Sequence, residues 1–371
     1  MHGLTDRIVS RAHELGFVCS GVVPAEPLPH GDAFRRWIDM GHHGDMDWLA
    51  RTRAIRDHPQ HLLASARSIV ALASSYHVAD ERQRPGELAM YARGYDYHQV
   101  LEHRLHTLAS FIRAETGQEV QTRAAVDRLP LLERDVAYMA GIGWYGKNTL
   151  ILNRNQGSYL FLAELIVDLE LEGVGSPMKD YCGTCTRCID ACPTDALIAP
   201  GRLDARRCIA YLTIEHRGPI PRPLRPGVGQ HLFGCDICQD VCPWNSKAPH
   251  TQDWPFLGRP DVLALTADRV LTLDPEQFRT LVQLSPIQRP KREGLLRNAA
   301  VVLGNSSERR WIPLLVERLK AEPSPLVRGH LAWALGHLGG RKARQALDDH
   351  LKREDDPYVL EEIRMALDEI A

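Results

Sequence analysis

Two short cysteine sets, each ending in Cys-Pro, constrain this chain more than any other feature. The first set spaces four thiols as C-x2-C-x2-C-x3-C-P, at Cys182, Cys185, Cys188 and Cys192. The second set is one separate cysteine followed by a C-x2-C-x3-C-P run, at Cys208, Cys235, Cys238 and Cys242. A segment this rich in thiols, with few large apolar residues, is expected to fold around the group that the thiols bind.

The spacing favours iron–sulfur clusters over zinc. Such a run folds three thiolates around one face of a [4Fe-4S] cluster, whereas a structural zinc site usually uses two separated CxxC pairs. In two-cluster ferredoxins the fourth cysteine of a run ligates the other cluster. Applied here, this rule assigns cluster one to Cys182, Cys185, Cys188 and Cys242. It assigns cluster two to Cys192, Cys208, Cys235 and Cys238. A pair of four-thiolate zinc sites is the alternative.

Composition sets the background. The chain has 371 residues, 44% of them hydrophobic and 25% charged, which is ordinary for a globular protein of two or three domains. No apolar run is long enough to cross a membrane, and the N-terminus lacks a signal-peptide core, so we expect a cytoplasmic protein with no membrane partner. In that compartment the cysteines are expected to be metal ligands, not disulfides. The ninth, Cys19, lies in an apolar stretch and is expected to be a buried, inert thiol.

The hydrophobic patterns predict an α+β protein of three domains. Helical periodicity is expected over 4–15 and 97–116, and strands over 17–23, 68–75 and 159–169. The predicted domains are a mixed α/β domain at 1–175, a two-cluster domain at 176–255 and a helical domain at 256–371. In the helical domain the segment that starts at Pro325 repeats at Pro357, a shift of 32 residues. A helical-hairpin repeat of this length is typical of the HEAT class, and a plain helical cap is the alternative.

The first domain contains two dense motifs. One runs from Val126 to Arg134 and includes an aspartate, Asp127, that is a candidate proton donor. The other, Gly141 to Thr149, combines three glycines with Lys147 and indicates close approach of the backbone to a flat or anionic group. A solvated turn with an ordinary Asp/Arg pair would also explain these residues. No G-x-G-x-x-G follows a strand, so a Rossmann nucleotide site is not supported.

Taken together, the motifs resemble the epoxyqueuosine reductase family. The resemblance rests on VDxxPxxER, GxGWxGKNT, GTCTRCIDACPTDA, FGCDICQDVCPWN and LLRNAAVVLGN, in that order along the chain. It implies that the protein performs the last step of queuosine formation in tRNA, which reduces an epoxide to an alkene with two electrons and two protons. It also implies a first domain similar to nitroreductases and reductive dehalogenases that holds cobalamin.

The resemblance further implies roles for particular residues. Asp127 would be the proton donor, and burial against the corrin would raise its pKa while Arg134 would lower it. Cobalamin would be bound by Asp127, Arg134, Gly146, Lys147, Asn148 and Thr213. A histidine ligand on cobalt is not expected, because Asp96-Tyr-His98 lacks the glycine of the D-x-H-x-x-G signature, so His98 is expected at a helix N-terminus.

Substrate and electron partners follow from the same resemblance. The net charge is -2, so tRNA, here with a GUN anticodon, must be bound by a local basic patch. Two arginine-rich stretches supply the candidates Arg217, Arg222, Lys291, Arg292 and Arg297. An external donor of the flavodoxin or ferredoxin kind would feed the clusters. The alternatives are a cobalamin-dependent reductase or dehalogenase of a small molecule, and a ferredoxin-type electron carrier without catalysis.

Overall fold

The computed structural model describes residues 3–79 and 87–370. The chain forms two compact units, each assembled from separate stretches. The first unit comprises the described parts of Met1–Ala79, Gly94–Ala205 and Asp236–Gly258. The second comprises the described parts of Asp80–Arg93, Arg206–Cys235 and Arg259–Ala371. The two compact units do not coincide with the three consecutive domains expected from the sequence. The cysteine-rich segment, expected to form a domain of its own, is divided between the two units.

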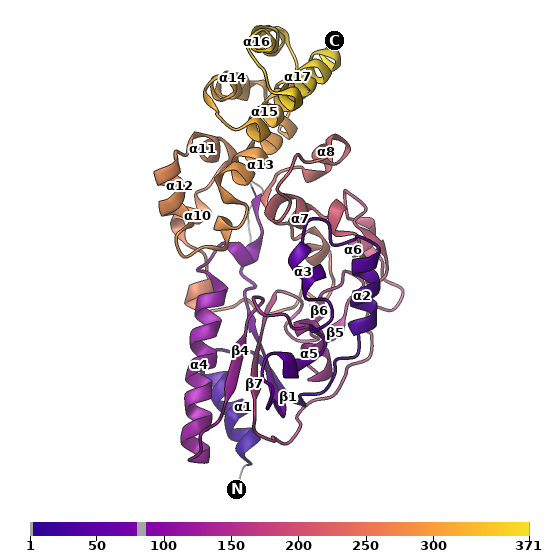
Figure 1. Ribbon diagram of the computed structural model, residues 1–371, viewed down its shortest axis with the longest axis vertical. Helices are drawn as coiled ribbons and strands as arrows, with labels where there is room; N and C mark the ends of the chain where they lie inside the picture. Colours follow the sequence, from indigo (N-terminus) through magenta and orange to yellow (C-terminus); the bar gives the residue numbers. More distant parts are fainter. Residues whose placement is uncertain (1–2, 80–86, 371) are drawn as a thin grey trace. The chain divides into compact units, whose positions relative to one another are not determined.

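A four-stranded antiparallel sheet forms the centre of the first unit (Figure 1). Its strands lie in the order β1 (Cys19–Pro24), β2 (Ser68–Ser75), β7 (Leu160–Val167) and β4 (Thr122–Ala125). All eight residues of β2 are buried, as its unbroken small and apolar sequence predicts for a central strand. The structure confirms the three predicted strands, with the first starting two residues later than expected.

Helices cover both faces of this sheet. The long helix α4 (Tyr97–Thr116) and α1 (Leu4–Glu14) pack together on one face, and α5 (Glu133–Met139) packs on the other. Helix α4 starts where the Asp96 carboxylate accepts a bond from the backbone N–H of His98, and it ends at Gly117 in a left-handed conformation. Both predicted helices are confirmed, as is the position of His98 in the first turn of a helix.

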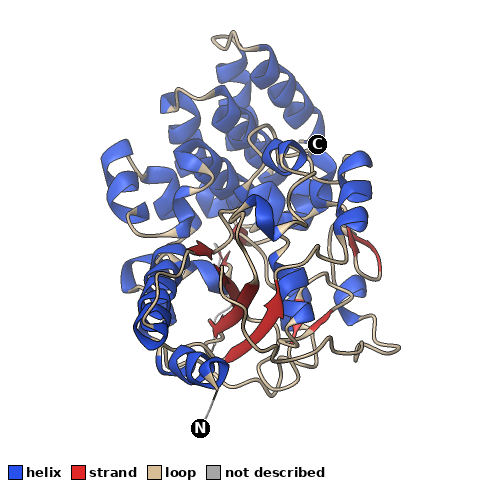
Figure 2. Cartoon of the chain, turned by 60° about the horizontal axis from the view of Figure 1, so that its bottom comes forward, coloured by secondary structure: helices blue, strands red, loops and turns tan. Residues whose placement is uncertain are grey.

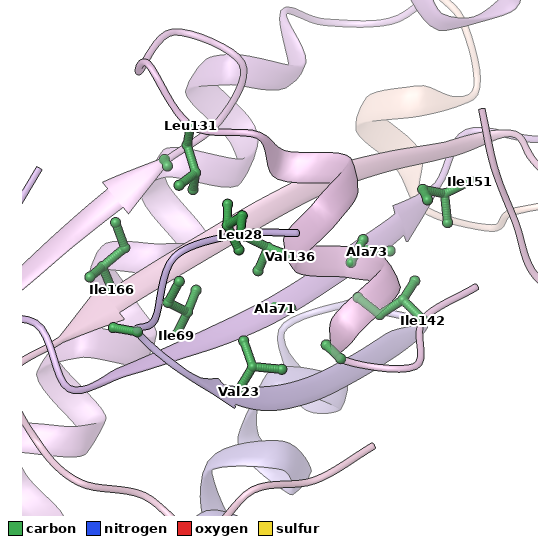
Figure 3. Packing of buried hydrophobic residues seen from close by; sticks show 14 residues of the cluster. Val23, Leu28, Ile69, Ala71, Ala73, Leu131, Val136, Ile142, Ile151 and Ile166 are labelled. Atoms are coloured by element: carbon green, nitrogen blue, oxygen red, sulfur yellow. The ribbon is translucent and has the colours of Figure 1, made fainter. Parts of the chain in front are cut away.

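The face of the sheet that meets α5 is largely apolar. Figure 3 shows Ile69 and Ala71 of β2, Ile166 of β7 and Val136 of α5 in one buried cluster. Because side chains alternate between the faces of a strand, Glu164 lies on the same face as Ile166. A fully buried carboxyl group therefore lies within an apolar layer.

Shorter elements complete the first unit. They are α2 (Gly31–Asp39), α3 (Asp47–Arg51), β5 (Trp144–Tyr145), β6 (Ile151–Leu152), α6 (Arg187–Asp190), β8 (Leu197–Ala199), β9 (Arg202–Leu203) and α9 (Ile237–Asp240). Strands β5 and β6 form a hairpin, as do β8 and β9. The single-turn helices α6 and α9 each follow the start of a cysteine run, and they pack against each other.

The second unit is almost entirely helical, as the blue ribbons of Figure 2 show. Its one small sheet pairs β3 (Glu87–Leu88) with β10 (His231–Phe233). The helices are α7 (Ile209–Ile214), α8 (Arg225–Val228), α10 (Pro260–Leu263), α11 (Ala267–Thr272), α12 (Pro275–Val282), α13 (Lys291–Asn305), α14 (Ile312–Ala321), α15 (Pro325–Leu338), α16 (Arg341–Leu351) and α17 (Pro357–Glu369). Among the described residues no helix is both long enough and apolar enough to span a membrane.

The predicted helical repeat is confirmed by α13, α15 and α17. Helices α15 and α17 begin at Pro325 and Pro357, which are the two positions related by the 32-residue shift. The three helices stack in order, with α14 and α16 between them in the chain. Gly336 brings α15 close to α17, since a Cβ atom there would lie 2.6 Å from the Cβ of Ala366. The period therefore reflects backbone packing between successive hairpins.

Buried ion pairs connect distant parts of the second unit. Arg225 is 1% exposed, and its Nη1 donates to Glu362 in the last helix at 2.8 Å. Arg222 pairs with the same carboxylate and with Glu369. Removing one partner of such a pair would leave an uncompensated charge inside the protein. The last helix is thereby tied to the segment that precedes β10.

A second buried pair provides a stability test. Arg328 donates to both oxygens of Glu354 at 2.7 and 2.8 Å, and this arrangement helps lower the pKa of Glu354 to about 2 despite its desolvation. Because the folded pKa is depressed, the stabilisation is present above the unfolded value and is lost as pH falls toward about 2. We predict that Glu354→Gln lowers the free energy of unfolding by about 3 kcal/mol at neutral pH, and by less in acid.

Urea unfolding of the wild type and the variant at several pH values measures this difference. Glu361→Gln is the matched control, because the Glu361 side chain is exposed and its contact with Arg364 is long. A destabilisation that does not change with pH would contradict the electrostatic explanation.

Candidate active site and cysteine segment

The candidate proton donor lies on a strained turn directly after strand β4. Asp127 has a φ of 58°, a left-handed conformation that non-glycine residues seldom adopt. Its backbone N–H donates to Oε1 of Glu133 at 2.5 Å, so the first residue of α5 holds the turn. Strain of about 1–3 kcal/mol at such a residue persists only where the surroundings fix it, and it is frequently found at active sites.

Two side chains at the start of α4 contact the Asp127 carboxylate. The hydroxyl of Tyr97 donates to Oδ2 at 2.6 Å, and Nε2 of His98 lies 3.7 Å from the same oxygen. The other ring nitrogen of His98 lies 2.7 Å from Oδ1 of Asp96. The side chain of Asp127 remains 63% exposed, so it is available to a bound molecule. Tyr97 was not identified as a site residue from the sequence. Nothing in the sequence marks it except that it stands between Asp96 and His98.

These contacts set the charges in the site. Desolvation opposes the charged form of His98, but the bonds and charges of Asp127 and Asp96 prevail and raise its pKa to about 9. For Asp127, desolvation acts upward, and the bonds from His98 and Tyr97 with the charges of His98 and Arg134 outweigh it. The pKa of Asp127 is therefore lowered. The sequence led us to expect a raised pKa for Asp127, and the protein's own residues lower it instead. Arg134 contributes to this lowering, as expected.

Two further acids near Asp127, Glu133 and Glu164, have raised pKa values. Desolvation and the charge of Asp127 raise the pKa of Glu133 to about 8. The pKa of Glu164 is raised well above its ordinary value, by desolvation and then by the charges of Glu133 and Asp127. Glu164 is fully buried, and its carboxyl oxygens accept no bond from an N–H or hydroxyl donor among the described residues, whereas the carboxyl group of Glu133 interacts with it. No sequence pattern indicates an acid that is buried in the middle of β7.

The glycine-rich turn between β5 and β6 contacts the cysteine segment. Gly146 is required there, because a Cβ atom would lie 2.1 Å from the Cδ1 of Leu152. The amine of Lys147 donates to the carbonyl oxygens of Gly183 and Cys185, at 2.7 and 2.9 Å. The amide of Asn148 donates to the carbonyl of Cys238 at 3.4 Å. Both side chains are thus engaged with the cysteine runs, whereas Arg134 is exposed and bonds to the carbonyl of Thr149.

Four thiols of the first unit lie near one another. Desolvation raises the pKa of Cys242, and the charges of three other thiols add to this effect, from Cys182, Cys188 and Cys185. These are the four ligands assigned to cluster one. The backbone N–H of Ala196 lies 3.3 Å from the sulfur of Cys192, a contact of the kind that tunes cluster potentials. Cys192 and Cys238 belong to the first unit, and Cys208 and Cys235 to the second, so the ligand set of cluster two stays a prediction.

The ninth cysteine is half-buried. Cys19 packs against the buried apolar cluster on the α5 face of the sheet, and desolvation raises the pKa of its thiol to about 11. A thiol with so high a pKa is a poor nucleophile and metal ligand, which agrees with the inert role expected for it.

Several residues predicted to contact tRNA or cobalamin are engaged inside the second unit. Arg297 is fully buried and donates to the carbonyl oxygens of Leu212, His216 and Gly218. Its guanidinium supports a loop and is not presented to solvent, which corrects the expectation that it contacts phosphate. Thr213 is also fully buried, with its hydroxyl bonded to Ile209 and Gly234, so it has no surface for cobalamin.

The remaining basic candidates differ in exposure. Arg222 is paired with two glutamates, and Arg292 bonds to the carbonyl of Leu273 and pairs with Glu322. Arg217 and Lys291 are exposed. Only these last two of the five candidates have side chains open to solvent.

The bonds made by Lys147 yield a prediction about the cysteine loop. Lys147→Met keeps the length of the side chain but removes the donor to Gly183 and Cys185, so we expect cluster one to dissociate faster. Iron content and the absorbance of the anaerobically reconstituted protein, followed during exposure to a chelator, measure this rate. Lys179→Met is the control, since Lys179 is an exposed lysine near the same segment. Equal rates for the two variants would show that the Lys147 bonds do not support the cluster.

Three known protein families match separate parts of the chain. Residues 181–245 match the family described as a 4Fe-4S double cluster binding domain, which decides for iron–sulfur clusters over zinc. Residues 56–128 match the family described as Epoxyqueuosine reductase QueG, and residues 289–368 match HEAT repeats. The predicted α+β multidomain class, its cluster domain and its HEAT-like repeats are thereby confirmed.

Similar proteins match the chain over most of its length. The epoxyqueuosine reductase of Xanthomonas campestris is 41% identical and covers 90% of this chain and 96% of its own. That of Pseudomonas aeruginosa is 42% identical, with 91% and 95% covered. An epoxyqueuosine reductase solved with an epoxyqueuosine-modified tRNA-Tyr stem loop is 30% identical, with a TM-score of 0.91 and coverage of 99% and 98%. The enzyme from Bacillus subtilis, solved with its catalytic aspartate loop swung out, is 30% identical, with a TM-score of 0.92 and 99% of both chains covered. This chain belongs to the epoxyqueuosine reductase family.

Proposed function

We propose that this protein reduces epoxyqueuosine in tRNA to queuosine, with Asp127 as the proton donor. The observation that carries the proposal is the strained, exposed Asp127, held through its backbone by Glu133 and contacted by Tyr97 and His98. Opening an epoxide leaves an oxygen that must be protonated, and the complete reaction requires two electrons and two protons and releases water. A carboxyl that is accessible yet fixed in position suits this task.

The family members support the same substrate. One relative was solved with an epoxyqueuosine-modified stem loop, and another with a catalytic aspartate loop outside the active site. A loop that moves is consistent with the position of Asp127 on an exposed turn whose backbone is bonded to the Glu133 side chain. From the sequence alone, the alternatives were a reductase of a small molecule and an electron carrier without catalysis. The relatives that match the chain over nearly its full length are epoxyqueuosine reductases, which supports neither alternative.

The electrons are proposed to enter through two [4Fe-4S] clusters. Cys182, Cys185, Cys188 and Cys242 would hold one cluster, and Cys192, Cys208, Cys235 and Cys238 the other. An external one-electron donor of the flavodoxin or ferredoxin kind would reduce them in the cytoplasm. Since Lys147 and Asn148 bond to the cysteine runs, the turn they belong to would lie between the clusters and the reacting centre.

Cobalamin is proposed as the group that receives these electrons. When bound, it supplies a cobalt centre that accepts electrons singly and delivers two to one substrate. Exposed Asp127 and Arg134 fit such a group, as does the backbone of the turn at Gly146, where a side chain would not fit. The side chains of Lys147 and Asn148 are already bonded, so they would contribute through their backbone. His98 is held by Asp96 and directed at Asp127, which leaves it as a partner of the acid.

We predict that Asp127→Asn abolishes turnover while the clusters and cobalamin still bind. The amide preserves the shape of the side chain but has no proton to give, so the rate should fall by about 100-fold or more. Anaerobic turnover of an epoxyqueuosine-containing anticodon stem loop, together with the visible spectrum of the loaded protein, measures both properties. Asp349→Asn on the surface of α16 is the control. Retained turnover in Asp127→Asn would remove Asp127 from this role.

Binding of tRNA is proposed to involve the exposed cations Arg217 and Lys291. Replacing both with alanine should weaken stem-loop binding and reduce the slope of log affinity against log salt by about one for each phosphate that is no longer neutralised. Affinity measured at several salt concentrations tests this, with Lys352→Ala, a 73% exposed lysine directly after α16, as the control. An unchanged slope would show that tRNA contacts other residues.

A further inference from the structure

We infer that Glu133 stores the proton that Asp127 delivers, so that the two carboxyl groups share one proton at neutral pH. The inference rests on the proposed function, because it concerns how the proposed acid is charged. It makes Glu133 a positioning residue and proton store that acts through Asp127, which alone would touch the substrate.

The geometry joins the two acids through one backbone bond. Oε1 of Glu133 accepts the N–H of Asp127 at 2.5 Å, so one carboxyl group is fixed against the residue that carries the other. Nothing in a structural bond of this kind requires an acid, since an amide oxygen accepts an N–H equally well. A carboxyl at this position adds one property, which is the capacity to hold a proton beside Asp127.

The buried acid on β7, Glu164, belongs to the surroundings that favour a protonated Glu133. Glu164 lies on the face of the sheet that meets α5, where Glu133 begins the helix. Its neighbours across the strands are two alanines, Ala71 and Ala125, which leave space for a carboxyl group but provide no hydrogen-bond donor. Glu164 is fully buried, and the charges of Glu133 and Asp127 act on its carboxyl group, so it is kept neutral. An ionised Glu133 would therefore face the negative charge of Asp127, and the neutral Glu164 adds no positive charge to balance it.

The charged groups around the acids determine where the proton rests. His98 from α4 lies beside Asp127, whereas Arg134 from α5 and Arg56 lie near both Asp127 and Glu133. Strand β2, on the other side of β7, contributes no titratable side chain. Close acids of this kind ionise in sequence. Asp127 is charged first because Tyr97 and His98 favour its anion, and Glu133 keeps its proton up to a pH of about 8.

Binding of substrate and cofactor would then move the proton. Asp127 is 63% exposed, and a bound molecule that covers it removes the water that stabilises its charge. The O–H bond of Glu133 breaks and an O–H bond forms on Asp127, so the negative charge passes to Glu133 near Arg134 and Arg56. No electrons move in this step. After Asp127 has given its proton to the substrate, the two acids take up one proton from water.

The dependence of turnover on pH tests whether Glu133 holds the proton that Asp127 delivers. Wild-type turnover should fall as pH rises through about 8, where Glu133 loses its proton. Glu133→Gln retains an oxygen for the Asp127 N–H but cannot hold the proton. We predict about a tenfold or greater loss of turnover at neutral pH, with an alkaline limb moved to lower pH. Glu133→Asp should restore part of the neutral activity, and Glu172→Gln, an exposed position after β7, is the control. A Glu133→Gln profile that coincides with the wild type would overturn the inference.

Infrared spectra of the loaded protein provide a readout that does not depend on activity. The wild type should show C=O bands from two protonated carboxyl groups, those of Glu133 and Glu164. One band should disappear as pH passes about 8 and be absent from Glu133→Gln. The other should not titrate and should be absent from Glu164→Gln. If the wild type does not turn over epoxyqueuosine RNA, the proposed function fails, and the titrating band still decides whether Glu133 holds the proton. A titrating band that persists in Glu133→Gln would show that Glu133 does not hold this proton.

Discussion

The hydrogen bond from the backbone of Asp127 to Glu133 determines what the rest of the site can do. It fixes a turn that would otherwise relax, because Asp127 occupies a left-handed conformation without the freedom of glycine. It also fixes the carboxyl group of Glu133 against the residue that carries the second acid. The sheet then supplies the burial and α4 supplies the cationic partner, so a single contact connects backbone geometry with the protonation of the site.

Much of the fold was predictable because its patterns are local. Strand β2 is an uninterrupted buried run, and α4 starts at a capping aspartate and ends at a glycine. The repeat was readable because the same helix contacts recur every 32 residues and require the same small side chains. The cysteine sets were readable because cluster ligation depends on spacing within short loops, which the matched 4Fe-4S family describes.

The roles of charged residues could not be predicted in the same way. Arg297 lies in a basic stretch, yet its partners are carbonyl groups about 80 residues earlier in the chain. Glu164 interrupts no pattern, because a single polar residue in a strand is usually solvent-facing. Asp127 was identified by resemblance, whereas its charge depends on Tyr97 and His98, which approach from another helix. Tertiary contacts, not sequence spacing, decide whether a charge meets solvent or a partner.

The ion pair between Arg225 and Glu362 has a consequence for how the protein is made. The arginine lies in the stretch that also carries Cys208 and Cys235, and its partner lies in the last helix. On the ribosome, that stretch emerges more than a hundred residues before the glutamate that neutralises it. The buried guanidinium therefore lacks its carboxylate partner until Glu362 has been synthesised, whereas the central sheet of the first unit has all its strands by Val167. The order of translation thus separates a sheet whose strands are all present early from a helical unit whose buried arginine is neutralised more than a hundred residues later.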